Sequence, residues 1–496
     1  MNNCLLFNVS TENMALKRGP GVYRIAYILR QHEWDVEVID YAKYWSLDEL
    51  KDLAKSRIND DTKFLGFSHM FSTWTDTLEE FCHWIKLTYP DIVVVSGSPV
   101  KPSFTSQSID YYIQGFGEHA ILVLLKYLFS NGVKPKINIF NNGLRKIIEA
   151  NDHYPAYPMA SLMIKYENRD FIEPWESLGV EFARGCKFAC DFCNFPILGV
   201  KGDYSRDADD FVLQMRDAYD RFGVTNYMVA DETFNDRTEK ITKFADAVEQ
   251  LDFTPWFSGF LRADLMISRE KDREELLRMG FLGHYYGIES FNTKTARTVG
   301  KGMDGDRVKQ GLVDIKDYFK SHGRKQYRGT ISLMVGLPHE SIASIYETKQ
   351  WLIDHWQGES FVTFATEIHQ YDLDKKSKMA LDYKKYGYSA MTEEQIAEAK
   401  TKTKFEEVVI HMGSDLLLWQ NDHMDWYSAI QLADEFYKLY YDNRHNFTLD
   451  CWGIHNPGLI GGIESRLARK RGTWIDASTV GDRIIKTYIN SKLNWR

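Results

Sequence analysis

The chain has 496 residues, 44% of them hydrophobic and 14% aromatic, which is enough to bury several cores and predicts two or three domains. Its formal net charge of −9 gives no overall attraction to nucleic acid and makes DNA or RNA an unfavoured partner. No run approaches the roughly eighteen apolar residues of a membrane-spanning helix, and the N-terminus lacks the basic flank of a signal peptide. We therefore expect a cytoplasmic protein without a membrane span.

The first 130 residues alternate short apolar runs with helical patterns. Strands are expected at 4–10, 35–40, 63–70 and 91–99, and the helix after residue 46 begins with Ser46 as its cap and acidic residues in its first turn. This alternation predicts a Rossmann-like open parallel sheet with helices on both faces. Ligands of such sheets bind beyond the carboxyl ends of the strands, here at 8–10, 66–68, 96–99 and 115–118.

A second strand–helix series begins near residue 176. Its strands are expected at 178–183, 225–231, 255–263, 282–290, 329–338 and 360–369. Six such units predict a closed or partly closed (β/α)6 barrel, whose reactive residues lie at the carboxyl ends of its strands. The predicted domains are therefore a Rossmann-like domain at 1–135, a connector at 136–175, the barrel at 176–375 and a helical extension at 376–496.

The segment "RGCKFACDFCNFP" at 184–196 holds three of the six cysteines and directly follows the first strand of the barrel. Disulfides are rare in the cytosol, so three close thiols favour a metal. Structural zinc sites use four ligands, usually as two separated pairs, and no second pair is present. Iron–sulfur clusters normally have four thiolates, and three would leave one iron open, as a catalytic metal requires. Cys4, Cys82 and Cys451 form no pattern, and we expect each to be a buried free thiol.

The pattern Cys-x3-Cys-x-aromatic-Cys after the first strand of a partial (β/α)6 barrel resembles the radical S-adenosylmethionine (SAM) superfamily. The resemblance implies a 4Fe–4S cluster bound by Cys186, Cys190 and Cys193, with the methionine amino and carboxylate groups of SAM on the open iron. One-electron reduction would then cleave SAM to methionine and a 5′-deoxyadenosyl radical, which abstracts a hydrogen from the substrate. The resemblance extends through most of residues 1–370.

The same resemblance implies SAM contacts near the cysteine loop. Phe192 matches the aromatic that packs near the adenine, and Asp231 and Glu232 in "MVADETFN" match the motif at the methionine amino group, with Ala-Asp-Glu in place of the commoner Gly-Gly-Glu. Arg262 in "FLRADL" has the fork geometry that suits a carboxylate. Taken alone, Asp231 and Glu232 could instead cap the helix that follows them.

Two later strand ends complete the implied SAM site. Glu289 and Ser290 in "YYGIESFN" stand where the family contacts the ribose hydroxyls, although Glu289 alone could be a solvated strand end. Gly336 and Pro338 in "GTISLMVGLPHES" match the segment that approaches the adenine, where glycine lets the backbone come close to a flat ring.

The N-terminal domain resembles the cobalamin-binding domain that precedes the radical barrel in one large subgroup of this superfamily. The resemblance lies in "GPGVYRIAYILRQHEWDVEVID", "VVVSGSP" and "IQGFGEHA". The Asp-x-His-x-x-Gly motif of many cobalamin proteins is absent, and Phe116 replaces the usual acidic residue. The alternative is a retained scaffold that positions the substrate. The cobalamin contacts that the resemblance implies are Ser68, Ser96, Gly97, Ser98, Gly115, Gly117 and Glu118.

The resemblance implies a radical SAM enzyme, and within its subgroup a cobalamin-dependent methyltransferase that acts on an unreactive carbon. The alternative is a cyclase, oxidase or rearranging enzyme of the same architecture, without methyl transfer or without bound cobalamin. A non-catalytic iron–sulfur protein would not need the SAM motifs. Expected partners are a small-molecule, lipid or peptide substrate and an electron donor such as flavodoxin or ferredoxin. Aromatic residues of the extension either line a pocket or form a helical core; they are Trp419, Trp426, Tyr440, Tyr441 and Trp452.

Overall fold

The computed structural model describes residues 2–9, 18–69, 74–98, 106–140, 145–155, 157–159, 163–195, 198–322, 327–356, 359–366, 368, 377–402, 416–442 and 477–495. Contacts divide the chain into two compact units. The first unit holds Met1–Glu181, Arg206–Tyr227 and Gly458–Arg496, and the second holds Phe182–Ser205 and Met228–Pro457. The predicted connector at 136–175 therefore shares its contacts with the first unit, while the predicted domain boundaries stay predictions.

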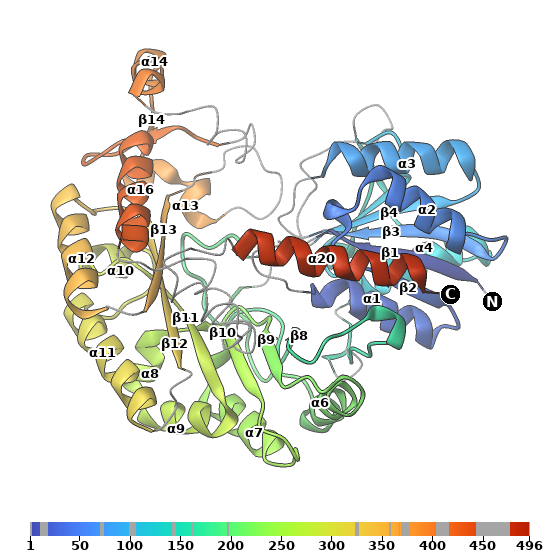
Figure 1. Ribbon diagram of the computed structural model, residues 1–496. Coiled ribbons are helices and arrows are strands. Elements are labelled where there is room, and N and C mark those ends of the chain that lie inside the picture. The colour runs from blue at the N-terminus through green and yellow to red at the C-terminus, as the bar shows by residue number, and fades with distance from the viewer. Residues whose placement is uncertain are drawn as a thin grey trace. The chain divides into compact units, whose positions relative to one another are not determined.

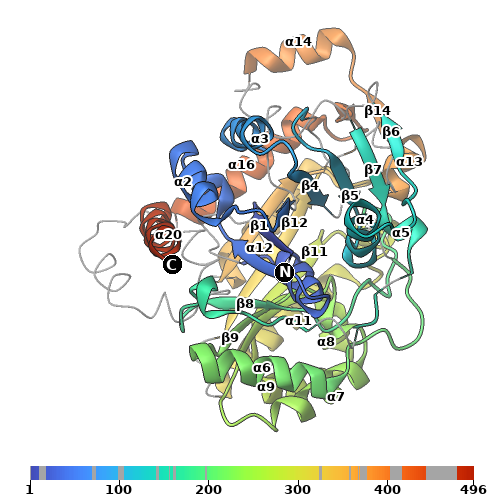
Figure 2. The ribbon, with the colours of Figure 1, turned by 90° about the vertical axis from the view of Figure 1, so that its right-hand side faces the viewer.

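The first unit is built on a seven-stranded sheet with the order β2-β1-β3-β4-β5-β7-β6. The paired strands run parallel, except that β6 is antiparallel to β7 at one edge beside α5 (Figure 2). This confirms the predicted open parallel sheet. The strands are β1 Asn3–Asn8, β2 Asp35–Ile39, β3 Thr62–Ser68, β4 Val93–Ser98, β5 Tyr111–Gln114, β6 Asn138–Phe140 and β7 Arg145–Glu149. The helices are α1 Pro20–Gln31, α2 Leu47–Arg57, α3 Asp76–Thr88, α4 Glu118–Phe129 and α5 Ala150–His153.

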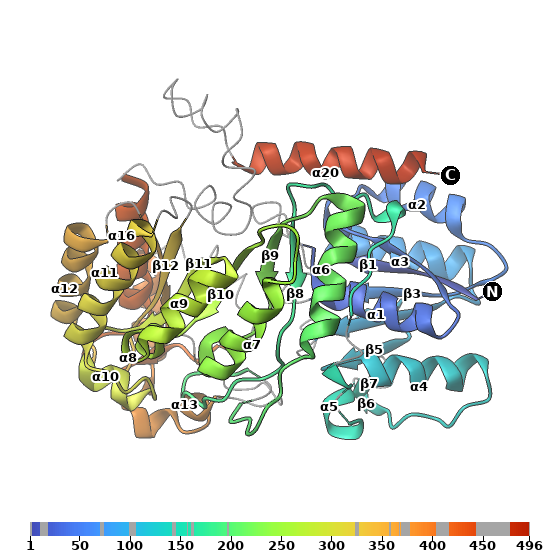
Figure 3. The same ribbon diagram turned by 90° about the horizontal axis from the view of Figure 1, so that it is seen from below.

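Helices cover both faces of this sheet, with α1 and α4 packed together on one face and α2 and α3 on the other (Figure 3). The start of α2 follows from its sequence. The backbone N–H of Glu49 donates to Ser46 Oγ at 3.3 Å, and the Glu49 carboxylate accepts from the Ser46 N–H at 2.8 Å. This capping box satisfies donors that the first helical turn leaves free and confirms the predicted cap.

The second sheet has six strands in the order β13-β12-β11-β10-β9-β8, so strands consecutive in sequence are neighbours. The strand pairs from β10 to β13 are parallel. Figure 1 shows these strands curving, with α8, α9, α11 and α12 on their outer side, as predicted for a partly closed barrel. The strands are β8 Ser177–Val180, β9 Asn226–Val229, β10 Trp256–Leu261, β11 Phe281–Glu289, β12 Arg328–Val335 and β13 Ser360–Ala365. The helices are α6 Ala208–Phe222, α7 Thr238–Val248, α8 Ala263–Ser268, α9 Glu270–Met279, α10 Thr293–Thr298, α11 Gly305–Ser321 and α12 Ile342–His355.

The described part of the C-terminal extension is mostly helical, as predicted, and its helices belong to different units. Helix α16 packs on β12 and β13 in the second unit, whereas α20 packs on α2 in the first. Trp419 and Trp426 are buried, which supports the core interpretation for these two. The side chains of Tyr440, Tyr441 and Trp452 lie outside the described residues. The elements are α13 Lys378–Leu381, β14 Ser389–Ala390, α14 Glu393–Lys402, β15 Trp419–Gln420, α16 Trp426–Asp442 and α20 Ala477–Asn494.

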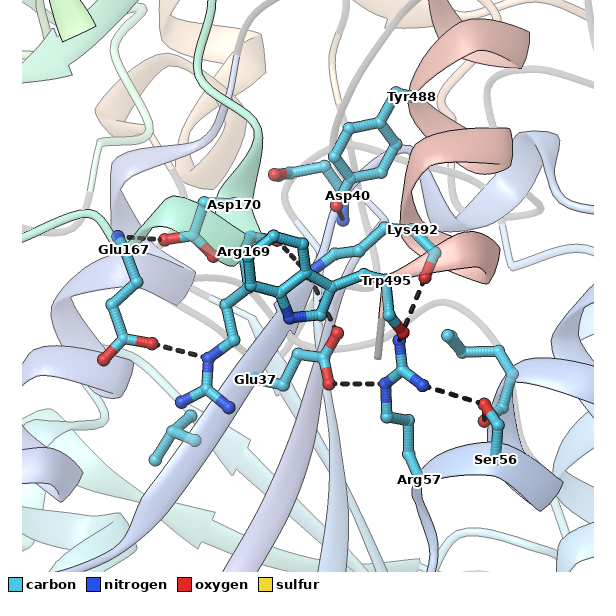
Figure 4. Close-up of polar contacts among 12 residues, drawn as sticks. Glu37, Asp40, Ser56, Arg57, Glu167, Arg169, Asp170, Tyr488, Lys492 and Trp495 are labelled. Carbon is cyan, nitrogen blue, oxygen red and sulfur yellow. Dashed lines mark hydrogen bonds and ion pairs between the residues drawn. The ribbon is translucent and has the colours of Figure 1, made fainter.

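Helix α20 is held against β2 by a buried lysine (Figure 4). Lys492 Nζ lies 3.0 Å from the Glu37 carboxylate and donates to the backbone carbonyl of Arg169 at 2.6 Å. The Asp40 N–H donates to Tyr488 Oη at 2.9 Å, and Arg57 donates to the carbonyl of Lys492 at 2.9 Å. The end of the chain is therefore part of the first unit's core. Within the described residues, no helix is long and apolar enough to cross a membrane.

Candidate functional site

The cysteine loop is tied to the end of β9 by Asp231. The backbone N–H groups of Phe182 and Ala183, just before the loop, donate to Asp231 Oδ1 at 2.8 and 3.1 Å. Lys240 Nζ lies 3.5 Å from the other carboxylate oxygen, and Asp231 is only 1% exposed. The carboxylate of Asp231 thus binds the backbone that leads into the loop, next to the half-buried Glu232.

The three cysteines lie in one loop, and each is a free thiol that is not part of a disulfide. Cys186 Sγ is 3.5 Å from Thr233 Oγ1, and Cys190 Sγ is 3.7 Å from the Gly300 carbonyl oxygen. Burial raises the pKa of the Cys193 thiol to about 11, and the charges of Cys190 and Cys186 nearby add to this shift. The described part of the chain holds no three His, Cys, Asp or Glu side chains arranged around a single metal ion. The donor set nevertheless fits an iron–sulfur cluster, because each thiolate of a cluster binds a different iron.

The middle of the loop is held by a segment of the extension. Asp191 lies between two of the cysteines, and its carboxylate contacts Lys378 Nζ at 3.1 Å and Tyr386 Oη at 2.7 Å. Its backbone N–H donates to the Val299 carbonyl at 3.1 Å, and its own carbonyl accepts from the Met379 N–H at 2.9 Å. The extension therefore stabilises the loop that carries the thiols.

Arg262, at the end of β10, faces the cysteine loop. Its Nη1 lies 3.6 Å from Cys190 Sγ, and its guanidinium carbon is 4.1 Å from the centre of the Phe188 ring. Asp264 accepts from Arg262 at 3.0 and 2.6 Å in a two-pronged contact. The structure therefore brings Arg262 to the cysteines themselves.

Glu289 and Phe192 are brought together by a lysine that the sequence analysis missed. Lys301 Nζ lies 3.2 Å from the Glu289 carboxylate, 2.8 Å from the Gly287 carbonyl oxygen and 5.7 Å from the centre of the Phe192 ring. Glu289 has a positive φ of 65° and follows an irregularity in the pairing of β11 with β12, which turns its side chain at the strand end. The signal in the sequence is slight: Lys301 stands between two glycines.

Ser290 and Gly336 meet at a second missed residue, Glu340. Ser290 Oγ donates to Glu340 Oε1 at 2.6 Å, and the Gly336 N–H donates to Oε2 at 3.3 Å. Burial raises the pKa of Glu340 to about 7. Glu289, Ser290 and Glu340 line a small pocket, and the Pro338 carbonyl accepts from Thr295 Oγ1 at 2.7 Å. Glu340 lies inside the motif "GLPHES", and its place just after Gly336 and Pro338 is the signal in the sequence that marks it as a site residue.

The predicted cobalamin contacts lie at the carboxyl ends of β3, β4 and β5 in the first unit. Ser68 pairs with Gly97, Ser98 pairs with Gln114, and the Gly115 N–H donates to the Ser98 carbonyl at 2.8 Å. These pairings place the small residues side by side. They also place Gly117 and Glu118 at the start of α4.

Two polar contacts alter the interpretation of this edge. His69 Nε2 lies 2.8 Å from Ser96 Oγ, and burial lowers the pKa of this histidine to about 4, which keeps it neutral. The Asp-x-His-x-x-Gly motif places a histidine only after β1, so it does not predict His69, which follows β3. Glu118 is buried and lies 4.0 Å from Arg24, so its carboxylate faces the interior. Cys4 and Cys82 are buried free thiols, as expected, and Cys451 lies outside the described residues.

Comparison with known proteins identifies the family of the domain that carries the cysteine loop. Residues 180–352 match the model of the radical SAM superfamily. Residues 180–352 therefore form a radical SAM domain, and this family implies a 4Fe–4S cluster and SAM as its cofactors. None of the curated proteins matches the chain in sequence.

Solved structures extend the likeness in fold to the N-terminal unit. One is the radical SAM methyltransferase TsrM from Kitasatospora setae, solved with its tryptophan substrate and a SAM analogue, at 13% identity and a TM-score of 0.60 over 79% of each chain. Another is the cobalamin-dependent SAM radical enzyme OxsB, with aqua-cobalamin and SAM bound, at 12% identity and a TM-score of 0.56. That alignment covers 99% of this chain and 79% of OxsB. The chain has the two-sheet architecture of these cobalamin-dependent radical SAM enzymes.

Proposed function

We propose that this chain is a cobalamin-dependent radical SAM methyltransferase that acts on an unreactive carbon. The observation that carries the proposal is the presence, in one chain, of a three-thiol loop after β8 and a parallel sheet with small residues at its carboxyl edge. The likeness in fold to TsrM and OxsB over most of the chain supports it. It would work in the cytoplasm with a reductant such as flavodoxin or ferredoxin, on a small-molecule, lipid or peptide substrate.

In this proposal Cys186, Cys190 and Cys193 hold three irons of the cluster and leave the fourth to SAM. The bound cluster and SAM supply the radical that removes a substrate hydrogen. Asp231 keeps the backbone of the loop in place, and Glu232 offers its carboxylate to the amino group of SAM.

In the same proposal, the adenosine half of SAM binds at the ends of the later strands of the sheet. Glu289 is held at a strand end by Lys301 and is oriented toward the ribose hydroxyls together with Ser290. Phe192 and the backbone of Gly336 and Pro338 bind the adenine.

In the first unit, the proposed cobalamin contacts are made by the hydroxyls of Ser68, Ser96 and Ser98 and by the backbone of Gly97, Gly115 and Gly117. Glycine permits close approach of a large planar ligand to the backbone. Glu118 is a weaker member of this set because its carboxylate faces Arg24.

The first test is the cofactor content of the protein. Protein purified anaerobically from cobalamin-supplemented cells should carry corrinoid in its absorption spectrum, and with SAM and a reductant it should release 5′-deoxyadenosine. Protein that is loaded with cluster and never cleaves SAM would contradict the enzyme assignment. Glu232→Gln and Glu289→Gln should each weaken SAM binding with the iron content unchanged, whereas Glu347→Gln, an exposed control on α12, should not.

The second candidate is a cyclase, oxidase or rearranging enzyme of the same architecture that transfers no methyl group. The lack of Asp-x-His-x-x-Gly after β1 and the inward-facing Glu118 favour it. Protein that cleaves SAM and carries no corrinoid would place this candidate ahead of the methyltransferase.

A further inference from the structure

Arg262 is fixed in place before any ligand binds. Its backbone N–H donates to Asn235 Oδ1 at 2.8 Å, and Asn235 Nδ2 donates back to its carbonyl at 2.9 Å. The side chain is almost wholly buried, with 6% exposed. Its backbone therefore cannot move away from the loop without breaking two buried hydrogen bonds.

Most N–H groups of the Arg262 guanidinium already donate hydrogen bonds within the protein. Nε and Nη2 bind the Asp264 carboxylate, and Nη2 also donates to the Lys301 carbonyl at 3.3 Å. The flat face of the group lies on the Phe188 ring. What remains is Nη1, which donates to Cys190 Sγ at 3.6 Å. A ligand carboxylate bound in the two-pronged geometry would use the parallel donors Nε and Nη2, and Asp264 already occupies them.

A fixed cation that donates to a cluster sulfur has a definite electrostatic effect. Reduction adds one negative charge to the cluster. Asp264 balances the charge of the arginine at Nε and Nη2, and the N–H of Nη1 still points its positive end at Cys190 Sγ, so this N–H···S bond stabilises the reduced form more than the oxidised form. The reduction potential of the cluster is therefore higher with the arginine than without it.

We infer that Arg262 is a positioning residue for Cys190 and raises the reduction potential of the cluster, before SAM binds. This rests on the proposed function, in which the loop holds a 4Fe–4S cluster. It differs from the role that the family resemblance implies, which is a contact to the SAM carboxylate.

The test is a redox titration of the reconstituted protein without SAM, followed by electron paramagnetic resonance. Arg262→Gln should lower the equilibrium constant for reduction about tenfold, which is 59 mV for one electron. Arg262→Lys keeps the charge and loses the fork and the ring contact, so it should give a smaller shift in the same direction. Arg278→Gln removes a surface arginine of the same unit, bound to Asp246 and Glu249, and should leave the potential unchanged.

A SAM-binding measurement on the same variants separates the two roles. If the cluster of Arg262→Gln has the reduction potential of the wild type, the inference is overturned. Weaker SAM binding by the same variant would then make Arg262 a SAM ligand. Arg262→Gln could take up less iron although its apoprotein has the melting temperature of the wild-type apoprotein. That result would support the positioning role, and the reduction potential would then be measured on Arg262→Lys. Wild-type protein that takes up no iron would instead refute the proposed function.

Discussion

Glu340 makes the stability of the second unit depend on pH. Its carboxyl group is buried between Ser290 Oγ and the Gly336 N–H, and burial raises its pKa to about 7 from an ordinary 4.5. The folded protein therefore binds a proton between these two pH values that the unfolded chain releases. The contribution to stability is fully present below about pH 4.5 and is lost as the pH rises through about 7. A shift of this size corresponds to about 3 kcal/mol.

The substitution that isolates this effect is Glu340→Gln. The amide has the shape of the protonated acid, can donate to Ser290 and accept from Gly336, and does not titrate. Between about pH 5.5 and 8 the free energy of unfolding of the wild-type apoprotein should fall by about 2 kcal/mol more than that of Glu340→Gln. Thermal unfolding of both proteins by circular dichroism measures the difference, with Glu347→Gln as the exposed control on α12. Parallel loss of stability by the wild type and Glu340→Gln over this pH range would refute the reasoning.

Three further substitutions test the site and the fold. Cys193→Ser should abolish cluster assembly, which iron and sulfide analysis measures, and near wild-type iron content would remove this residue from the ligand set. Lys492→Met should destabilise the first unit by about 3 kcal/mol because, among the described residues, Glu37 loses one of its two basic partners and keeps only Arg57; an unchanged free energy of unfolding in denaturant would contradict this. Gly336→Ala should lower the melting temperature, because φ is +93° and a methyl group would collide with the Trp419 ring; an unchanged melting temperature would contradict this.

The parts of the site that sequence could predict are those set by local spacing. The cysteine loop is recognisable because its thiols lie within eight residues. The strand ends are recognisable because parallel strands bring their carboxyl ends to one edge. The Ser46 cap is likewise a pattern of four residues.

What the sequence could not predict depends on contacts between distant residues. Lys492 and Glu37 are 455 residues apart, and a lysine near the end of an amphipathic helix ordinarily lies in water. Glu340 and Ser290 are 50 residues apart, and their hydrogen bond depends on the rotamers that Ser290 adopts after β11 and Glu340 adopts in the turn between β12 and α12. Neither partner can be found from periodicity.

The Ala-Asp-Glu motif after β9 shows how a departure from a family pattern can be explained by contacts. A glycine at the second position has no side chain to offer, whereas Asp231 accepts two N–H groups from the start of the cysteine loop and pairs with Lys240. The aspartate therefore links β9 to the loop through its carboxylate, and the next residue, Glu232, remains the member of the motif proposed for SAM. Because Asp231 is buried among these partners, its replacement by asparagine should disturb the loop first and SAM binding only as a consequence. The acidic pair thus divides into one residue that holds the loop and one that is available to the cofactor.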